Sequence, residues 1–236
     1  MTIISHSRKF IYIRPRKAAT STTEIVLRNY LLFDKDICSY EPQFKNYYFN
    51  NGKYIFNFRN LLLNIKIFLL NSKKNYYPII CREFDDPHMP ANEIIKRIGL
   101  KNFRQYFILS SIRNPYYMMI SAARQKYNKN LKLNKDKLNE TIQDKSKIFF
   151  ELNKVYFDKT HRNVVDFFVR TEKLDQDLNY FCKKILNVKA KHIKIPVKNK
   201  SKNEEFTIRD LSKENIRLIN YHADYIFKLG KYKKIN

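Results

Sequence analysis

Four short runs of β-branched and aromatic residues constrain the fold of this chain most strongly, because a polar loop and a segment with helical periodicity follow each run. The runs occupy 10–13, 78–81, 106–112 and 164–169. The helical segments occupy 24–33, 91–98 with Gly99 as its stop, 115–127, 147–158, 174–186 and 212–229. Strands that alternate with helices predict an α/β fold in which helices flank a mainly parallel sheet.

The length of 236 residues fits a single domain spanning 1–236, and apolar residues, 44% of the chain, are spread widely enough to build one core. Residues 40–75 match no motif and are interpreted as an insertion that carries one apolar helix at 61–70. That run falls below the roughly 20 residues of a membrane-spanning helix, so no transmembrane segment is expected. Residues 128–144 are rich in Lys and Asn, and we expect a solvated segment there.

The charge of the chain predicts an anionic ligand. There are 47 Lys and Arg against 22 Asp and Glu, which gives a formal net charge of +25. Such an excess steers phosphates, sulfates and acidic glycans toward the surface, although part of it accompanies a general abundance of Lys, Asn and Ile. No recognised nucleic-acid-binding motif is present, so we expect no nucleic-acid partner.

The three cysteines, Cys38, Cys81 and Cys182, are widely spaced and form neither a CxxC pair nor a Cys/His pattern. Neither a disulfide framework nor a zinc site is therefore predicted. Free cysteines suit a reducing compartment, and we expect a cytoplasmic protein, either free or peripheral to a membrane.

Polar side chains follow three of the expected strands, and ligands of open parallel sheets bind at the carboxyl ends of strands. Lys17 follows the first strand, His88 lies in the loop after the second, and Arg113 and Asn114 end the third. We expect these side chains to converge on one site.

A run of hydroxyl residues precedes the helix expected at 24–33. Ser21, Thr22 and Thr23 are candidate N-caps for it. The first turn of a helix presents unpaired backbone N–H groups, so this helix start is suited to binding an anion.

The segment 10–24, FIYIRPRKAATSTTE, resembles the 5′-phosphosulfate loop of the sulfotransferase superfamily, particularly its carbohydrate and bacterial branch. The resemblance implies that Lys17 contacts the bridging oxygen of the donor, 3′-phosphoadenosine-5′-phosphosulfate (PAPS). It implies further that Thr20, Ser21 and Thr22 bind the 5′-phosphate, and that Arg16 and Ala19 of the same loop also belong to the donor-binding site. Family loops usually carry glycine before the Thr/Ser pair, where Ala18 and Ala19 stand here. Alanine is accommodated there in an αR backbone but not readily at positive φ.

A second segment, 107–121, FILSSIRNPYYMMIS, resembles the 3′-phosphate motif of the same superfamily. Arg113 and Ser121 occupy the phosphate-binding positions of that motif. Two weaker resemblances follow in the correct order, 168–174 (FVRTEKL) and Asn199-Lys-Ser before a helix that ends near 224–232. The resemblance then covers nearly the whole chain and implies the P-loop-like sulfotransferase fold.

The activity implied is transfer of a sulfuryl group from PAPS to a hydroxyl, with adenosine 3′,5′-bisphosphate (PAP) as product and no metal. The acceptor implied by the resemblance is a glycan, and the charge of the chain suggests an anionic one.

A base is needed to take the proton of the acceptor hydroxyl, and His88 is the candidate because it alone of the histidines follows an expected core strand. The stretch 87–94, PHMPANEI, also resembles the His-x-x-Ala-x-Glu-Ile/Leu stretch of bacterial sulfotransferases. An ordinary imidazole would give an activity that rises through pH 6 to 7. His88 could instead cap the following helix or bind acceptor oxygens, and Glu83 is the alternative base.

Two other functions fit parts of the sequence. A P-loop kinase also places a phosphate loop after a first strand, but no glycine precedes Gly52 and no acidic residue ends the third strand. A basic nucleic-acid-binding protein would explain the charge and the aromatic content.

Each site residue also has a purely structural explanation. Lys17 and Ser121 could be surface side chains, and Arg113 could pair with an acidic neighbour. Arg170 and Glu172 could form a structural ion pair at the end of the last strand.

Overall fold

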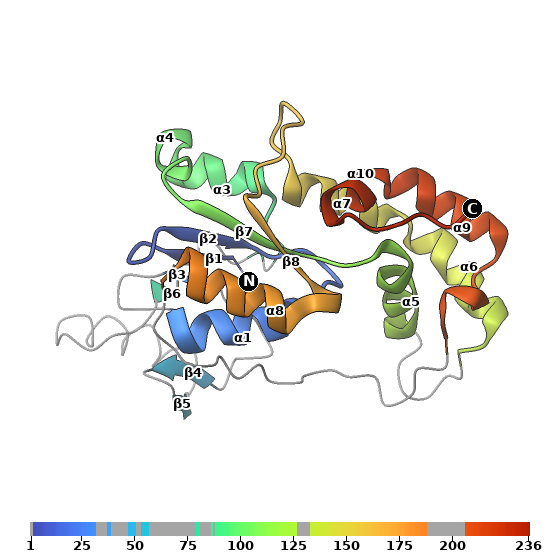
Figure 1. Cartoon of the computed structure of the whole chain (residues 1–236), viewed down its shortest axis with the longest axis horizontal. Helices are drawn as coiled ribbons and strands as arrows, with labels where there is room; N and C mark the ends of the chain where they lie inside the picture. The colour runs from blue at the N-terminus through green and yellow to red at the C-terminus, as the bar shows by residue number, and fades with distance from the viewer. Residues whose placement is uncertain are drawn as a thin grey trace.

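The computed structural model describes residues 2–31, 37–38, 47–50, 53–56, 79–80, 86, 88–126, 133–187 and 206–236. Within these residues the chain forms a six-stranded sheet, a separate two-stranded sheet, and helices that flank the larger sheet (Figure 1). The α/β class with a mostly parallel sheet, as the sequence predicts, is confirmed.

The larger sheet has the strand order β6-β3-β1-β2-β7-β8. The strands are β1 Ile3–Ser5, β2 Phe10–Ile13, β3 Ile37–Cys38, β6 Ile79–Ile80, β7 Phe107–Ile112 and β8 Phe167–Arg170. β2, β7 and β8 run parallel, whereas β1 is antiparallel to both of its neighbours. The carboxyl ends of β2, β7 and β8 therefore share one edge of the sheet, where ligands of such sheets bind.

The helices lie mainly between and after these strands. They are α1 Thr20–Leu31, α3 Ala91–Ile98, α4 Leu100–Phe103, α5 Pro115–Lys126, α6 Lys135–Lys145, α7 Lys147–Tyr156, α8 Leu174–Tyr180, α9 Lys213–His222 and α10 Asp224–Gly230. Among the described helices, none is long and apolar enough to cross a membrane.

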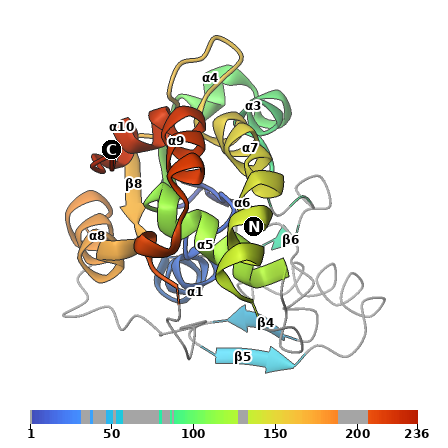
Figure 2. The same cartoon turned by 90° about the vertical axis from the view of Figure 1, so that its right-hand side faces the viewer.

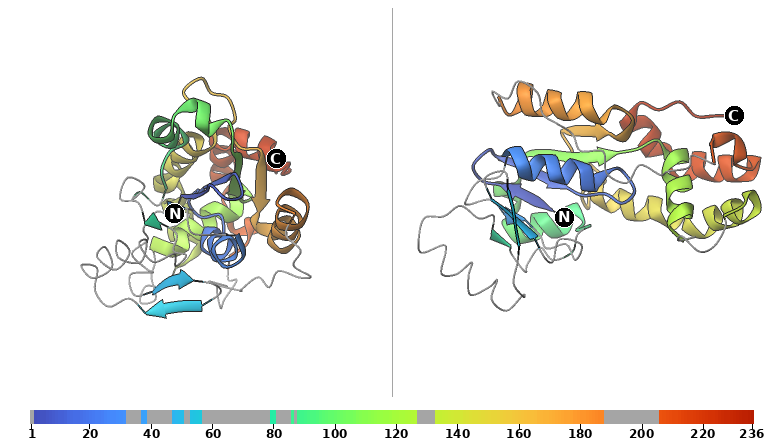
Figure 3. Two further views of the ribbon diagram at one scale, coloured as in Figure 1. Left: turned by 90° about the vertical axis from the view of Figure 1, so that its left-hand side faces the viewer. Right: turned by 90° about the horizontal axis from the view of Figure 1, so that it is seen from below.

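Alternation of side chains along β2 divides the core between the two faces of the sheet. Phe10 and Tyr12 pack with Leu27 of α1 in a cluster to which α8 also contributes, and Figure 3 shows α1 and α8 together beneath the sheet. Ile11 and Ile13 belong to the larger cluster on the opposite face, which α3 and α7 cover. Because both faces of β2 are packed in the core, the end of this strand is held in place, and so is the first residue of the loop that follows it.

The helices α5, α6, α7 and α9 gather at one end of the sheet (Figure 2). The segment 128–144 was expected to be mobile and solvated; its described part instead forms most of the helix α6, and many of its residues are exposed. Asn134 caps this helix by accepting a hydrogen bond from the Lys137 N–H, and Leu138 and Ile142 are buried. Residues four apart share one helix face, so two apolar side chains suffice to anchor a lysine-rich helix.

Other boundaries differ from expectation by a few residues. β8 begins three residues later than the strand expected at 164–169, and the C-terminal helix is divided at Ala223 into α9 and α10. In the insertion expected at 40–75 the structure describes two paired strands, β4 Tyr47–Asn50 and β5 Lys53–Phe56. The helix expected at 61–70 lies outside the described residues.

Candidate functional site

The loop between β2 and α1 turns sharply by means of two left-handed residues. Lys17 has φ 62° and Ala19 has φ 49°, although neither is glycine. A non-glycine residue in this region costs about 1–2 kcal/mol, so the surrounding contacts must hold the loop in place. Left-handed residues in a turn also direct neighbouring backbone N–H groups toward one point, an arrangement that binds anions.

α1 begins earlier than the sequence indicates. The N–H groups of Thr22 and Thr23 donate to the carbonyl oxygen of Ala19, each at 3.2 Å, so Ser21, Thr22 and Thr23 lie within the first turn. The expectation that these three residues are N-caps is wrong, because the left-handed Ala19 starts the helix before them. Their hydroxyls lie at the helix start with no acidic side chain in the first turn.

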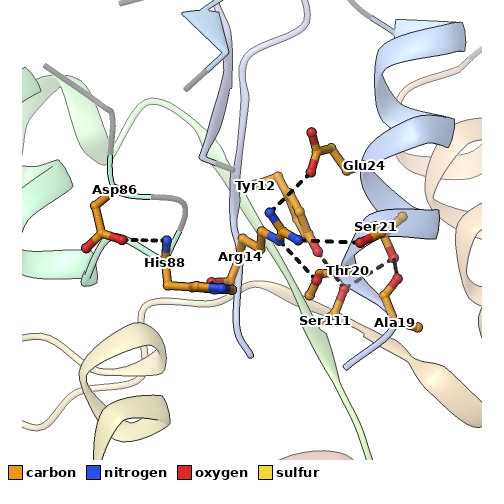
Figure 4. Close-up of polar contacts among 10 residues, drawn as sticks. Tyr12, Arg14, Ala19, Thr20, Ser21, Glu24, Asp86, His88 and Ser111 are labelled. Carbon is orange, nitrogen blue, oxygen red and sulfur yellow. Dashed lines mark hydrogen bonds and ion pairs between the residues drawn. The ribbon is translucent and has the colours of Figure 1, made fainter. Parts of the chain in front are cut away.

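Arg14, the first residue after β2, is buried beneath this loop and was not singled out from the sequence (Figure 4). Its Nε donates to Thr20 Oγ1 at 3.0 Å and its Nη2 donates to Ser21 Oγ at 3.4 Å. Its Nη1 forms an ion pair with Glu24 Oε2 at 3.6 Å, and both side chains are almost wholly buried. The guanidinium group therefore connects the end of the central strand with the first turn of α1.

Tyr12 and Ser111 support the loop from the sheet. The Tyr12 hydroxyl lies 2.9 Å from Ser111 Oγ, and Ser111 Oγ donates in turn to Thr23 Oγ1 at 3.3 Å. All three groups are buried. This chain of hydroxyls links β2, β7 and α1 at the edge where the candidate site lies.

Arg113 at the end of β7 meets the loop after β2. Its Nη1 donates to the carbonyl oxygen of Lys17 at 3.4 Å. Its Nε is buried and has no hydrogen-bond partner among the described residues. Burial lowers the pKa of Arg113, and the Glu172 carboxylate acts in the opposite direction. A buried N–H donor without a partner is typical of a site that binds an anion. In a structural ion pair this donor would already be paired.

Lys17 reaches toward α5, where its Nζ donates to Gln125 Oε1 at 3.0 Å. Burial and then the Arg113 charge lower the pKa of Lys17 to about 8. Two cations held close enough to repel each other favour an anion between them. These contacts argue against the alternative explanation, in which Lys17 is a freely solvated surface lysine.

Ser121 lies on α5 four residues before Gln125, and the two side chains share a helix face. No hydrogen bond joins Ser121 to Arg113 among the residues that the structure describes. Arg124, on the same helix, repels Arg113 and donates to the Phe206 carbonyl oxygen at 3.2 Å. Arg124 and Gln125 were not predicted from the sequence, although their helical spacing from Ser121 is a signal that could identify them.

His88 reaches the site, although β6 lies at the far edge of the sheet. Its Nδ1 is 3.3 Å from the carbonyl oxygen of Arg14, and its backbone N–H donates to Asp86 Oδ1 at 2.8 Å (Figure 4). A carbonyl only accepts, so Nδ1 carries the proton and Nε2 of the neutral ring is left with a lone pair. Burial, followed by the Arg14 charge, lowers the pKa of His88 to about 4.

His88 does not cap α3, because the N-cap residue is Pro90. The alternative base, Glu83, lies outside the described residues. The explanation of His88 as the cap of α3 is therefore wrong.

The remaining candidates lie at the margin of the site. Arg16 is half exposed and pairs with Glu151 of α7 at 3.4 Å. Arg170 pairs with Asp177 at 2.7 Å and not with Glu172. The hydrogen bond to Asp177 raises the pKa of Arg170.

Glu172 accepts hydrogen bonds from the Asn114 N–H at 2.9 Å and from the Tyr232 hydroxyl at 2.8 Å. The C-terminal tail is thereby attached to the start of α5. The expected pairing of Arg170 with Glu172 is wrong, because Glu172 serves the loop after β7 instead.

Within the described part of the chain, no group of three or more His, Cys, Asp or Glu side chains could hold a metal ion. Comparison of the chain with protein-family models, with curated proteins and with solved structures finds no match.

Proposed function

We propose that this protein is a sulfotransferase that moves a sulfuryl group from PAPS to a hydroxyl of a glycan acceptor. The observation that carries the proposal is the contact between the two segments that resemble phosphate motifs, in which Arg113 donates to the carbonyl oxygen of Lys17. Residues 96 positions apart in sequence thereby form one cationic site at the carboxyl edge of the sheet.

The donor would lie across this edge. Its 5′-phosphosulfate would contact Lys17 and the hydroxyls of Thr20 and Ser21 at the start of α1. Its 3′-phosphate would accept from the Nε of Arg113, which has no partner among the described residues, and from Ser121, as the resemblance implies. Phosphate groups prefer such sites because charged donors and a helix N-terminus both stabilise negative charge.

The chemistry is an in-line displacement at sulfur. The acceptor oxygen forms a bond to sulfur as the bond from sulfur to the bridging oxygen of the donor breaks, and PAP leaves. His88 Nε2 takes the proton of the acceptor hydroxyl. Lys17 stabilises the negative charge that develops on the bridging oxygen.

A transfer assay tests the proposal. The protein is incubated with donor that carries labelled sulfate and with separate cell-envelope polysaccharide fractions, and label in each fraction is counted. The proposal predicts label in at least one fraction, taken up more slowly by a factor of roughly 10² or more with the Lys17→Ala variant. A parallel arm with γ-labelled ATP and Mg²⁺ tests the kinase alternative, and transfer only in that arm would replace the proposal.

A further inference from the structure

Arg14 makes contacts that the proposed function does not require of it. The residue directly follows β2, and it is 5% exposed. Burying a guanidinium group is costly unless every N–H finds an acceptor. Two hydroxyls of the candidate loop accept hydrogen bonds from it, and the Glu24 carboxylate forms an ion pair with Nη1 at 3.6 Å, so the loop and the buried charge depend on each other.

The chemistry of a hydroxyl group gives these contacts a direction. A guanidinium group has only donors, so Thr20 Oγ1 and Ser21 Oγ must accept from it. Each hydroxyl has one hydrogen, which cannot point back at the donating N–H. The hydrogens of Thr20 and Ser21 are therefore left to donate on the side away from Arg14.

Glu24 fixes the guanidinium group in this orientation. Its carboxylate lies one turn into α1 and is wholly buried beside Arg14. The pair is close to neutral as a unit, so Arg14 orients its neighbours without adding an unbalanced buried charge. Lysine cannot reproduce the arrangement, because an ammonium group lacks the planar fork that reaches two hydroxyls and a carboxylate together.

We propose that Arg14 is a positioning residue that holds the Thr20 and Ser21 hydroxyls as acceptors, so that both donate their hydrogens to an anionic group bound in the loop. The inference rests on the proposed function only in that an anion occupies this loop. Arg14 acts on the anion through these hydroxyls, because its Nε and Nη2 donate to Thr20 and Ser21 while its Nη1 pairs with Glu24.

The test measures binding of inorganic pyrophosphate and of PAP by calorimetry. Arg14→Lys should weaken pyrophosphate binding about tenfold, because two hydrogen bonds to a charged group lose their orientation. In a Thr20→Val/Ser21→Ala background the same change should alter affinity by less than about twofold, since the groups through which Arg14 acts are gone. Arg217→Lys, the same substitution at an exposed arginine of α9, is the control and should bind like the wild type.

A purely structural role would give a different pattern. Arg14→Lys would then bind pyrophosphate like the wild type, or would lose the same factor in both backgrounds, and either result overturns the inference. If Arg14→Lys does not fold, Arg14→Met/Glu24→Met replaces the buried pair with apolar side chains and is tested in the same two backgrounds.

The two ligands separate this inference from the proposed donor. Pyrophosphate binding with the predicted dependence on Arg14, together with no binding of PAP, supports the inference and overturns the donor assignment. Binding of neither ligand to the wild-type protein overturns both.

Discussion

Arg113 Nη1 donates a hydrogen bond to the carbonyl oxygen of Lys17 at 3.4 Å, and this contact joins the ends of two adjacent parallel strands, β2 and β7. The backbone carbonyl holds the arginine in place while the buried Nε of Arg113 remains without a partner among the described residues. The lysine side chain is directed to α5 instead, where it meets Gln125. Each residue of the pair therefore keeps a charged group for a ligand.

Arg113 should recognise the 3′-phosphate of the donor. Arg113→Ala should weaken binding of PAP by at least about tenfold, because a charged hydrogen bond is lost. Binding of a 5′-monophosphate analogue should change much less, since it has no 3′-phosphate. Titration calorimetry with both ligands checks this, and equal losses for the two would contradict the assignment.

Lys17 should act on the rate more than on binding. Lys17→Ala should lower kcat by roughly 10² or more while PAP affinity is comparatively preserved, because the charge on the bridging oxygen develops only in the transition state. The charged form of Lys17 is needed, and burial lowers its pKa to about 8, so kcat/KM should fall as the pH rises above that value.

The control for Lys17 is Lys228→Ala on α10, where the lysine is exposed. Its rate and pH profile should match those of the wild type. A Lys17→Ala variant with unchanged kcat would refute the role of this lysine.

His88 should give the acid limb of the same pH profile. The neutral ring is the active form, and burial lowers its pKa to about 4, so kcat/KM should be level near neutral pH and fall only as the pH approaches 4. An ordinary imidazole would place the acid limb of the activity at pH 6 to 7, and burial of His88 moves this limb to lower pH. His88→Ala should remove most of the activity and leave PAP affinity nearly unchanged.

The profile distinguishes His88 from the alternative base. If His88→Ala keeps the wild-type pH profile within a few-fold of the normal rate, Glu83 becomes the residue to test. An acid limb at pH 6 to 7 in the wild type would show that the ring is not buried as described.

Ala19 should be the strained position of the loop. Ala19→Gly should stabilise the protein by about 1 kcal/mol, because glycine adopts φ 49° without the steric cost of a Cβ. Ala18 is buried and lies outside the left-handed region, so Ala18→Gly should instead destabilise by about 1 kcal/mol. Urea unfolding of both variants measures the difference, and a shift of the same sign in both would exclude strain at Ala19.

Local signals predicted the fold well where they were complete. α3 was predicted at its observed bounds, because Gly99 ends it with φ 81° and donates its N–H to the Ile95 carbonyl. β1 was not predicted because a strand of three residues is too short to show an alternating pattern of apolar and polar side chains. It is buried because it pairs with both β2 and β3. α6 was not predicted because Leu138 and Ile142 are isolated apolar residues in a lysine-rich stretch, and their burial depends on packing of α6 against α5 and α9.

The candidate site was predictable in part for the same reason. Parallel pairing of β2 with β7 brings Lys17 and Arg113 together, and both residues follow recognisable strands. The contacts of Arg14 were not predictable, because they depend on the left-handed Ala19 and on Glu24, a buried carboxylate in the next helix. The contact of His88 with the Arg14 carbonyl was likewise not predictable, because β6, the strand before His88, is separated from β2 by β3 and β1.

The central claim is that the loop after β2 and the end of β7 bind the nucleotide PAP, and a thermal-shift titration tests it most directly. PAP, ATP with Mg²⁺, and a single-stranded oligonucleotide are each added at matched concentrations to the wild type and to Arg113→Ala. Ligand binding stabilises by RT ln(1 + [L]/Kd), so a true ligand raises the Tm with concentration. We expect the largest rise with PAP and loss of that rise in Arg113→Ala. A larger rise with ATP or with the oligonucleotide, unaffected by Arg113→Ala, would contradict it.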